Sequence, residues 1–225
     1  MCGRVVQFSP LQVIIELFGV IPTPGGLTVG PRYNLAPTQD ILAIRQADDG
    51  TRQLLNLHWG LIPFWAKAPD MGGRMINARA ETVAEKPAFR EPFRRRRCLI
   101  PIDGFYEWQR LGTQKQPHYI HRRNDRPFGL AGLWERWSKG DQTIESCTIL
   151  TTSPNDLMRP IHDRMPVILS QEDYAAWLAP ESKASDLLKL LKPYEGDELA
   201  EYPVSTRVNI PKNDDPGCIT PLSQG

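Results

Sequence analysis

Residues 98–152 carry four short hydrophobic runs that decide the fold: CLIPI (98–102), HYIHR (118–122), FGLAGLW (128–134) and TIESCTILTT (143–152). Each run is rich in β-branched or aromatic residues and is flanked by polar or turn-forming residues, as β-strands are. Two earlier runs have the same character, ILAIR (41–45) and QLLNLHW (53–59). Many strands and little helix predict an α+β fold built on a curved, barrel-like mixed β-sheet.

Helical patterns are few, so we expect only a few flanking helices. Residues 10–19 have the apolar spacing of a short amphipathic helix. Ser170 with Asp173 resembles a capping box that opens a second helix, and residues 182–192 predict a third. Residues 21–31, rich in Pro and Gly, and the last twenty or so residues are expected to be loops.

Composition excludes several classes of protein. The chain of 225 residues carries 27 basic and 26 acidic residues, so it has no strong overall attraction to nucleic acid or membrane. No apolar run approaches the roughly 20 residues of a membrane-spanning helix, and no signal peptide is recognisable. The cysteines at 2, 98, 147 and 218 are too far apart for a zinc motif or a disulfide framework. We therefore predict one domain over 1–225, without metal or cofactor, in the cytoplasm.

The sequence MCGR (1–4) offers an unusual nucleophile. If Met1 is removed, Cys2 carries a free α-amine beside a free thiol. Such a 1,2-aminothiol can form an imine with an aldehyde and then close a thiazolidine ring through sulfur. The reference pKa values of the two groups, about 8 and about 8.5, leave both partly reactive near neutral pH. The alternative is an ordinary buried cysteine near the chain end.

Two further residues are candidates for proton transfer. Glu107 stands among aromatics in GFYEW (104–108), where burial would raise its pKa and let it donate a proton near neutral pH. His162 lies between two prolines in PIHDRMP (160–166), on a stiff loop. The alternatives are a surface glutamate on an alternating strand and a structural histidine.

Aromatic and basic segments suggest a nucleic-acid surface. Residues 58–65, HWGLIPFW, form an aromatic loop that would either stack on unpaired bases or pack in the core. Arginines cluster at 90–97 and 122–126, either as a solvated face or as a local track for phosphates.

The ordered set of motifs resembles the SRAP family, the "SOS response-associated peptidase" domain. It comprises MCGR (1–4), RYNLAP (32–37), WGLIP with Trp65 (59–65), NARAET (77–82), CLIP with GFYEW (98–108) and IHDRMP (161–166). The resemblance extends from residue 1 to about residue 210. It implies a single α/β domain with a barrel-like β core, and covalent crosslinking to abasic sites in single-stranded DNA. The family name records an older proposal of self-processing that removes Met1.

The resemblance also implies roles for individual residues. Cys2 would supply amine and sulfur, Glu107 the acid/base carboxylate, His162 a proton-transfer group, and Asn77 an amide that positions the N-terminus. DNA contacts are expected from two arginines, from the 32–37 motif and from the aromatic loop: Arg4, Arg79, Asn34, Pro37, Trp59, Phe64 and Trp65. The family often has two adjacent tryptophans where this chain has Phe64 and Trp65. The short tail after the motifs suggests a bacterial stand-alone protein, which we expect to be a monomer.

Three rival classes share parts of this pattern. Class II glutamine amidotransferases also begin Met-Cys-Gly, but the full set of segments that bind glutamine, Arg-Gly-Pro with Asn-Gly-Glu and Gly-Asp, is not found in this sequence. A thiol peptidase or a noncovalent single-strand-binding module remain alternatives. Substitution of Cys2 by alanine separates them, because a binding module would keep its affinity for DNA.

Overall fold

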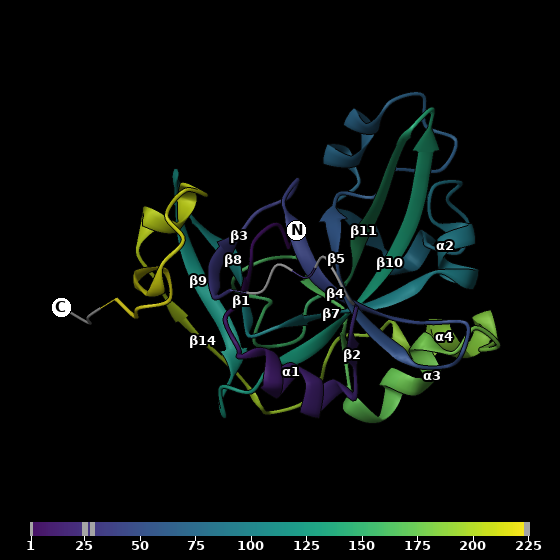
Figure 1. Cartoon of the computed structure of the whole chain (residues 1–225). Coiled ribbons are helices and arrows are strands. Elements are labelled where there is room, and N and C mark those ends of the chain that lie inside the picture. Colours follow the sequence, from purple (N-terminus) through teal and green to yellow (C-terminus); the bar gives the residue numbers. More distant parts are fainter. Residues whose placement is uncertain (1, 24–26, 28–29, 223–225) are drawn as a thin grey trace.

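The computed structural model describes residues 2–23, 27 and 30–222 of the chain. Within them, two β-sheets lie side by side, with short helices on the outside of the larger sheet (Figure 1). The α+β prediction with a barrel-like mixed sheet is confirmed.

The larger sheet contains a closed ring of five strands: β4 (Asp40–Gln46), β5 (Arg52–Trp59), β7 (Arg97–Ile102), β10 (Phe128–Lys139) and β11 (Gln142–Thr152). Four of the pairings, β5–β4, β4–β7, β7–β10 and β10–β11, are antiparallel. The ring closes through a parallel pairing of β11 with β5, in which Ser146 lies opposite His58 and Cys147 opposite Trp59.

Short strands extend this barrel. β2 (Ile21–Pro22) pairs with β5, while β6 (Asn77–Arg79) and β12 (Met165–Pro166) pair with β11, and β13 (Ile168–Leu169) pairs with β10. The smaller sheet is antiparallel, in the order β14 (Leu199–Pro203), β9 (Gln114–Arg122), β8 (Gly104–Leu111), β1 (Val5–Gln7) and β3 (Arg32–Leu35).

Helices cover the outer side of the barrel: α1 (Leu11–Phe18), α2 (Arg90–Arg95), α3 (Tyr174–Leu178) and α4 (Ala184–Leu190). Short 3-10 turns complete the described elements, at Pro69–Arg74, Ala80–Thr82, Gln171–Asp173, Thr206–Asn209 and Pro216–Cys218.

Alternation along the barrel strands divides the core in two. Ile41 and Ile100 point inward, into a cluster that also holds Phe105 and Ile120 of the smaller sheet. Their neighbours on the opposite face, such as Leu99, pack against the helices. The inner cluster therefore joins barrel and smaller sheet, and Cys2 is one of its members.

All six predicted β runs are strands, and the first helix matches its prediction. Other predictions need correction. Ile21–Pro22 is a strand rather than loop, while residues 24–26 and 28–29 of that predicted loop lie outside the described residues. Ser170 makes no side-chain cap, since its carbonyl rather than its hydroxyl binds the Asp173 N–H. The last helix covers only Ala184–Leu190, and β8 and β14 were not predicted.

Candidate functional site

Glu107 and His162 come together in one cleft, between the smaller sheet and the loop at 160–164. The cleft has a volume of about 470 Å³ and is lined by Glu107, Trp108, Arg110, Lys115, Ile161, His162 and Asp163. His162 Nε2 lies 3.9 Å from Glu107 Oε2. Strand β8 carries the carboxylate, and a separate loop brings the imidazole to it.

Glu107 is only 1% exposed. Burial raises the pKa of its carboxyl, and the nearby positive charge of a protonated His162 opposes this rise only in part. The carboxyl therefore keeps its proton to higher pH than an exposed glutamate does, as a general acid near neutral pH requires.

The proton position on His162 follows from its backbone contact. The Arg164 N–H donates to Nδ1 over 3.0 Å, so in the neutral ring Nδ1 is an acceptor and the proton is on Nε2, facing Glu107. Asp163 Oδ1 also lies 3.0 Å from Nδ1. With the neutral-ring proton on Nε2, Asp163 accepts a hydrogen bond from Nδ1 only when the ring is charged and both nitrogens carry a proton. The ring thus has a polar partner in both charge states.

Arg164 fixes this loop to the barrel. Its guanidinium binds both carboxylate oxygens of Glu81, at 2.6 and 2.9 Å, and donates to the Thr151 carbonyl over 2.7 Å. Arg164 lowers the pKa of Glu81, which stays ionised. A bidentate pair of this kind sets orientation as well as distance, so His162 stands two residues from a firm anchor.

Asn77 and Arg79 lie on β6, which runs parallel to β11 with Asn77 opposite Ile149 and Arg79 opposite Thr151. The same Thr151 binds Arg164, so β6 and the His162 loop meet on β11. The Asn77 amide donates to the Ile149 carbonyl over 3.4 Å, while its buried Oδ1 accepts no hydrogen bond from the described residues. Arg79 is exposed.

Cys2 is fully buried, at the start of the segment that becomes β1. Tyr106 N–H donates to the Arg4 carbonyl over 3.0 Å, which directs the chain end along β8 towards Glu107. Burial, and secondarily the charge of Glu107, raise the pKa of the Cys2 thiol well above its ordinary value. The thiol is therefore protonated at neutral pH, and its use as a nucleophile needs a base nearby.

Arg4 and Asn34 are held by the C-terminal segment, residues 206–218. Arg4 Nη1 donates to Asn34 Oδ1 over 2.7 Å and to the Val208 carbonyl over 2.6 Å. The Asn34 amide in turn donates to the carbonyls of Val208, Ile210 and Asn213.

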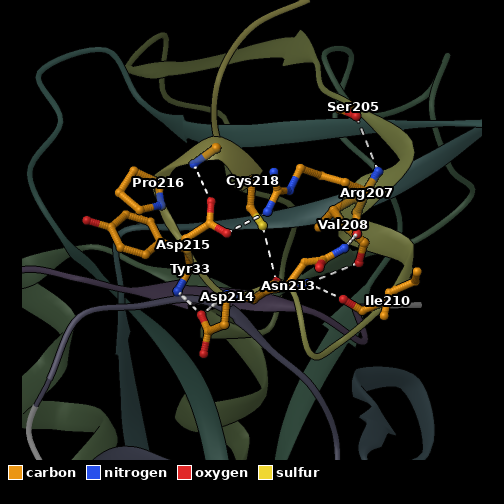
Figure 2. A network of polar contacts seen from close by, with 12 residues as sticks. Tyr33, Ser205, Arg207, Val208, Ile210, Asn213, Asp214, Asp215, Pro216 and Cys218 are labelled. Carbon is orange, nitrogen blue, oxygen red and sulfur yellow. Dashed lines mark hydrogen bonds and ion pairs between the residues drawn. The ribbon is translucent and has the colours of Figure 1, made fainter.

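Figure 2 shows how the same segment is fastened to β3. Asp214 accepts a hydrogen bond from the backbone N–H of Tyr33 (Figure 2). It also accepts one from the backbone N–H of Asn34, and its carboxylate pairs with Arg32. Further on, Cys218 Sγ donates to the Asn213 carbonyl. The Trp108 indole N–H donates to Asn209 Oδ1, so residues 208 and 209 brace both the segment before β1, at Arg4, and strand β8, next to Glu107.

The family model for SOS response associated peptidase (SRAP) matches residues 1–211. The chain belongs to the SRAP family. An SRAP relative in Bacillus subtilis, abasic site processing protein YoqW, is 47% identical over 222 residues, covering 97% of this chain and 99% of that protein. Abasic site processing protein HMCES of Xenopus tropicalis is 34% identical, over 85% of this chain and 66% of that protein.

A solved structure of a protein from Bacteroides thetaiotaomicron has the same SRAP fold. It superposes with a TM-score of 0.88 at 28% identity and covers 98% of this chain and 100% of that one. None of the described helices is long and apolar enough to span a membrane. Across the described residues, no three His, Cys, Asp or Glu side chains gather as a metal site would.

The aromatic loop of this SRAP chain presents only part of the predicted surface. Phe64 and Trp65 are 60% and 47% exposed, but Trp59 is fully buried and its indole N–H donates to the Ile76 carbonyl. Close backbone contact holds the loop, because a Cβ on Gly60, at φ +140°, would lie 2.6 Å from the Gly72 carbonyl oxygen. Trp59 ends a strand whose alternate residues are buried. We had expected it to contact DNA, and the structure assigns it to the core instead.

Asn34, another predicted DNA contact, also differs from expectation, whereas the contact predicted for Pro37 stays a prediction. Asn34 is buried and bound to backbone carbonyls, so it supports Arg4 instead of facing a ligand. Pro37 is half-buried. The arginine cluster at 90–97 is not one continuous track, because the Arg97 guanidinium is buried against the carbonyls of Phe93, Trp177 and Ala179.

Residues that support the site were missed by sequence reasoning. Arg164, Glu81 and Thr151 fix the histidine loop, and Asn209 fixes Trp108. Arg164 and Glu81 were visible within two of the motifs, as one cation and one carboxylate, but no local pattern pairs residues 83 positions apart.

Proposed function

We propose that this SRAP protein captures abasic sites in single-stranded DNA covalently through Cys2. Its relatives in B. subtilis and X. tropicalis are named abasic site processing proteins. The observation that carries the proposal is the buried Glu107, which faces His162 in one cleft and whose pKa is raised by burial. The charge of the same carboxyl also raises the pKa of the Cys2 thiol.

The chemistry begins when removal of Met1 leaves Cys2 with a free amine. The neutral amine attacks the aldehyde of the ring-opened deoxyribose and gives a carbinolamine. Glu107 donates its proton to the departing hydroxyl, water leaves, and a protonated C=N bond forms in which the nitrogen keeps its remaining hydrogen. Glu107 is then a carboxylate beside a thiol whose pKa burial has raised.

Ring closure uses that carboxylate as a base. The Cys2 sulfur adds to the carbon of the protonated C=N bond as Glu107 takes the thiol proton, and the nitrogen keeps its hydrogen, which returns Glu107 to its acid form. The product is a thiazolidine, and one water has been released in all. One carboxyl thus acts first as acid and then as base, and the imidazole of His162, with its Nε2 proton towards Glu107, relays protons to the sugar oxygen.

Binding is assigned to groups around the cleft. Asn77, with its unused buried Oδ1, would accept a hydrogen bond from the Cys2 amine. Arg79 and Arg4 would contact phosphates, and Phe64 with Trp65 would stack on bases next to the lesion. Such stacking needs splayed bases, so we expect the protein to prefer single strands over intact duplex. We also expect the protein to be a monomer in the cytoplasm.

Intact mass spectrometry after incubation with an abasic oligonucleotide tests this proposal. The wild-type protein, lacking Met1, should gain the mass of the oligonucleotide less one water, and the adduct should survive heating. Cys2→Ser keeps an amine and should give only a labile imine, which hydride reduction would trap. Heat-stable adduct from Cys2→Ala at the wild-type rate would refute the proposal.

The amidotransferase and peptidase alternatives are not favoured. Processing of Met1 by the protein itself, and strand cleavage by β-elimination at the imine, remain separate activities. The same mass experiment reports on both, as loss of Met1 from the protein and as a shortened oligonucleotide.

A further inference from the structure

The cleft that holds Glu107 and His162 has a cationic wall that the proposed chemistry does not use. Arg110 of β8 and Lys115 of β9 line the cleft. They are directly opposite each other in the β8–β9 ladder, so their side chains stand on the same face of the sheet. Both are exposed.

Two like charges in directly opposed positions weaken a sheet unless something neutralises them. Within the described parts of the chain, neither Arg110 nor Lys115 forms an ion pair. The two carboxylates of this cleft, Glu107 and Asp163, both face His162 instead. The wall therefore has two positive charges that are available to an anion from outside.

The position of the wall follows from where β1 ends. β1 pairs with β8 only at Gly104 and Phe105, and the last hydrogen bond joins Tyr106 to Arg4. Past that point β1 no longer covers the edge of β8, and the β8–β9 hairpin continues as far as Leu111 and Gln114. A polymer that enters the cleft can therefore continue along this arm of the hairpin.

We propose that Arg110 and Lys115 form a phosphate-binding subsite for the DNA strand on one side of the abasic sugar. The inference rests on the proposed function, since a deoxyribose in the cleft carries a phosphate on each side. Arg4 already donates Nη1 to Asn34 and Val208, which leaves it fewer free donors. Arg110 and Lys115 therefore supply positive charge in addition to Arg4, whose guanidinium is partly bound within the protein.

Salt dependence of binding tests the subsite separately from the chemistry. The ligand is a single-stranded oligonucleotide with a tetrahydrofuran abasic analogue, which has no aldehyde and cannot crosslink. Each phosphate neutralised on a single strand adds about 0.7 to the slope of log K against log salt. Arg110→Ser with Lys115→Ser should therefore lower that slope by about 1.4. The matched control is Arg94→Ser with Arg95→Ser, two exposed arginines on α2 that should leave the slope unchanged.

A second measurement locates the contacted phosphate. Oligonucleotides with one methylphosphonate, placed in turn on each side of the analogue, remove a single charge from the DNA. At the position of the contacted phosphate, the methylphosphonate should weaken binding by the wild type. The double variant, which lacks the contact, should lose no further affinity there. An unchanged salt slope, or equal losses in both proteins at every position, would overturn the subsite.

Folding and chemistry are controlled in the same series. Arg110→Lys, which keeps the charge, should have the wild-type slope if loss of charge causes the effect in the double variant, and thermal melting of each protein checks stability. Crosslinking by the double variant at saturating abasic DNA should stay within about twofold of wild type. Failure of the wild type to crosslink at all would refute the proposed function and leave the binding result to decide the subsite.

Discussion

His162 presents its Nε2 proton to Oε2 of Glu107 across 3.9 Å. This distance is too long for a direct hydrogen bond, which needs about 3.2 Å or less. An oxygen that lies beside the pair, off the line joining the two atoms, can come within hydrogen-bond distance of both. The pair is therefore arranged around an oxygen atom that a substrate would bring.

Substitution of Glu107 by glutamine should slow crosslinking by about 10²-fold, the usual contribution of a general acid–base group. The wild-type rate should fall as pH rises above the raised pKa of Glu107, because the proton donor is lost, and this limb should be missing in the variant. By microscopic reversibility, release of a preformed adduct should slow as well. Single-turnover kinetics between about pH 5 and pH 9 measure both. A wild-type rate in Glu107→Gln would place the acid elsewhere; His162→Ala, tested alongside, should also slow crosslinking.

The same substitution should not destabilise the fold. Since burial raises the folded-state pKa of Glu107 above its unfolded value, the folded protein binds the extra proton, and stability falls as pH rises from the unfolded towards the folded pKa. Glutamine removes this ionisation, so Glu107→Gln should melt at or above the wild-type temperature at pH 8. At pH 4, below both pKa values, the two proteins should differ less. If Glu107→Gln melted below the wild type at pH 8 but not at pH 4, the assigned direction of the Glu107 pKa shift would be contradicted.

Breaking the Arg164–Glu81 pair should impair catalysis through His162. Arg164→Lys keeps the charge but loses the two parallel hydrogen bonds, and Glu81→Gln removes the other partner. Each should slow crosslinking at saturating DNA, and the double variant should be no slower than the worse single one. In stability we expect a coupling of only about 0.5–1 kcal/mol, since the Glu81 side chain is half exposed. Strictly additive rate effects would mean that the pair does not act as a unit.

Substitution of Trp65 should affect DNA binding, and substitution of Trp59 should affect the stability of the fold. Trp65→Ala removes an exposed ring, so it should cost about 1–3 kcal/mol of affinity for single-stranded DNA and leave stability within about 0.5 kcal/mol. Trp59→Ala empties a buried site and should cost about 3–5 kcal/mol of unfolding free energy. Fluorescence anisotropy and urea titration provide the two readouts. Loss of stability in Trp65→Ala would assign that ring to packing.

Asn34→Ala should destabilise the protein by about 3 kcal/mol. The change leaves the Val208 and Asn213 carbonyls and part of Arg4 without their buried partner. The control is Ser205→Ala, an exposed cap of the same segment whose loss should cost about 1 kcal/mol or less. Urea unfolding measures both. Equal effects would mean that the C-terminal segment contributes little to the fold.

Much of the barrel was predictable because its strands are apolar runs rich in β-branched or aromatic residues and flanked by polar or turn-forming residues. The alternation of Leu55, Leu57 and Trp59 even contained the signal that Trp59 is buried, which the concentration of aromatics at 58–65 obscured. The ring closure was not predictable, since it depends on a parallel pairing of Cys147 with Trp59, far apart in sequence. Local patterns carry no information about such contacts.

The site was predicted as a set of residues rather than as an arrangement. Glu107 and His162 were expected in one site, and the structure places them in the same cleft. Asn34 was assigned to DNA because its motif is polar, whereas its partners are backbone carbonyls that no side-chain pattern reveals. The C-terminal segment has no periodicity, so its tight attachment to β3 could not be anticipated.

The attachment of residues 206–218 to Arg4 and Asn34 has a consequence for synthesis of the protein. The ribosome makes Arg4 first, and its partner Val208 follows 204 residues later. Until Val208 has been made, the Arg4 guanidinium lacks one of the two acceptors of its Nη1 group, and a chain that breaks off before residue 208 lacks it altogether. The brace on the residues that precede β1 is therefore set late in synthesis, after all five strands of the barrel have been made.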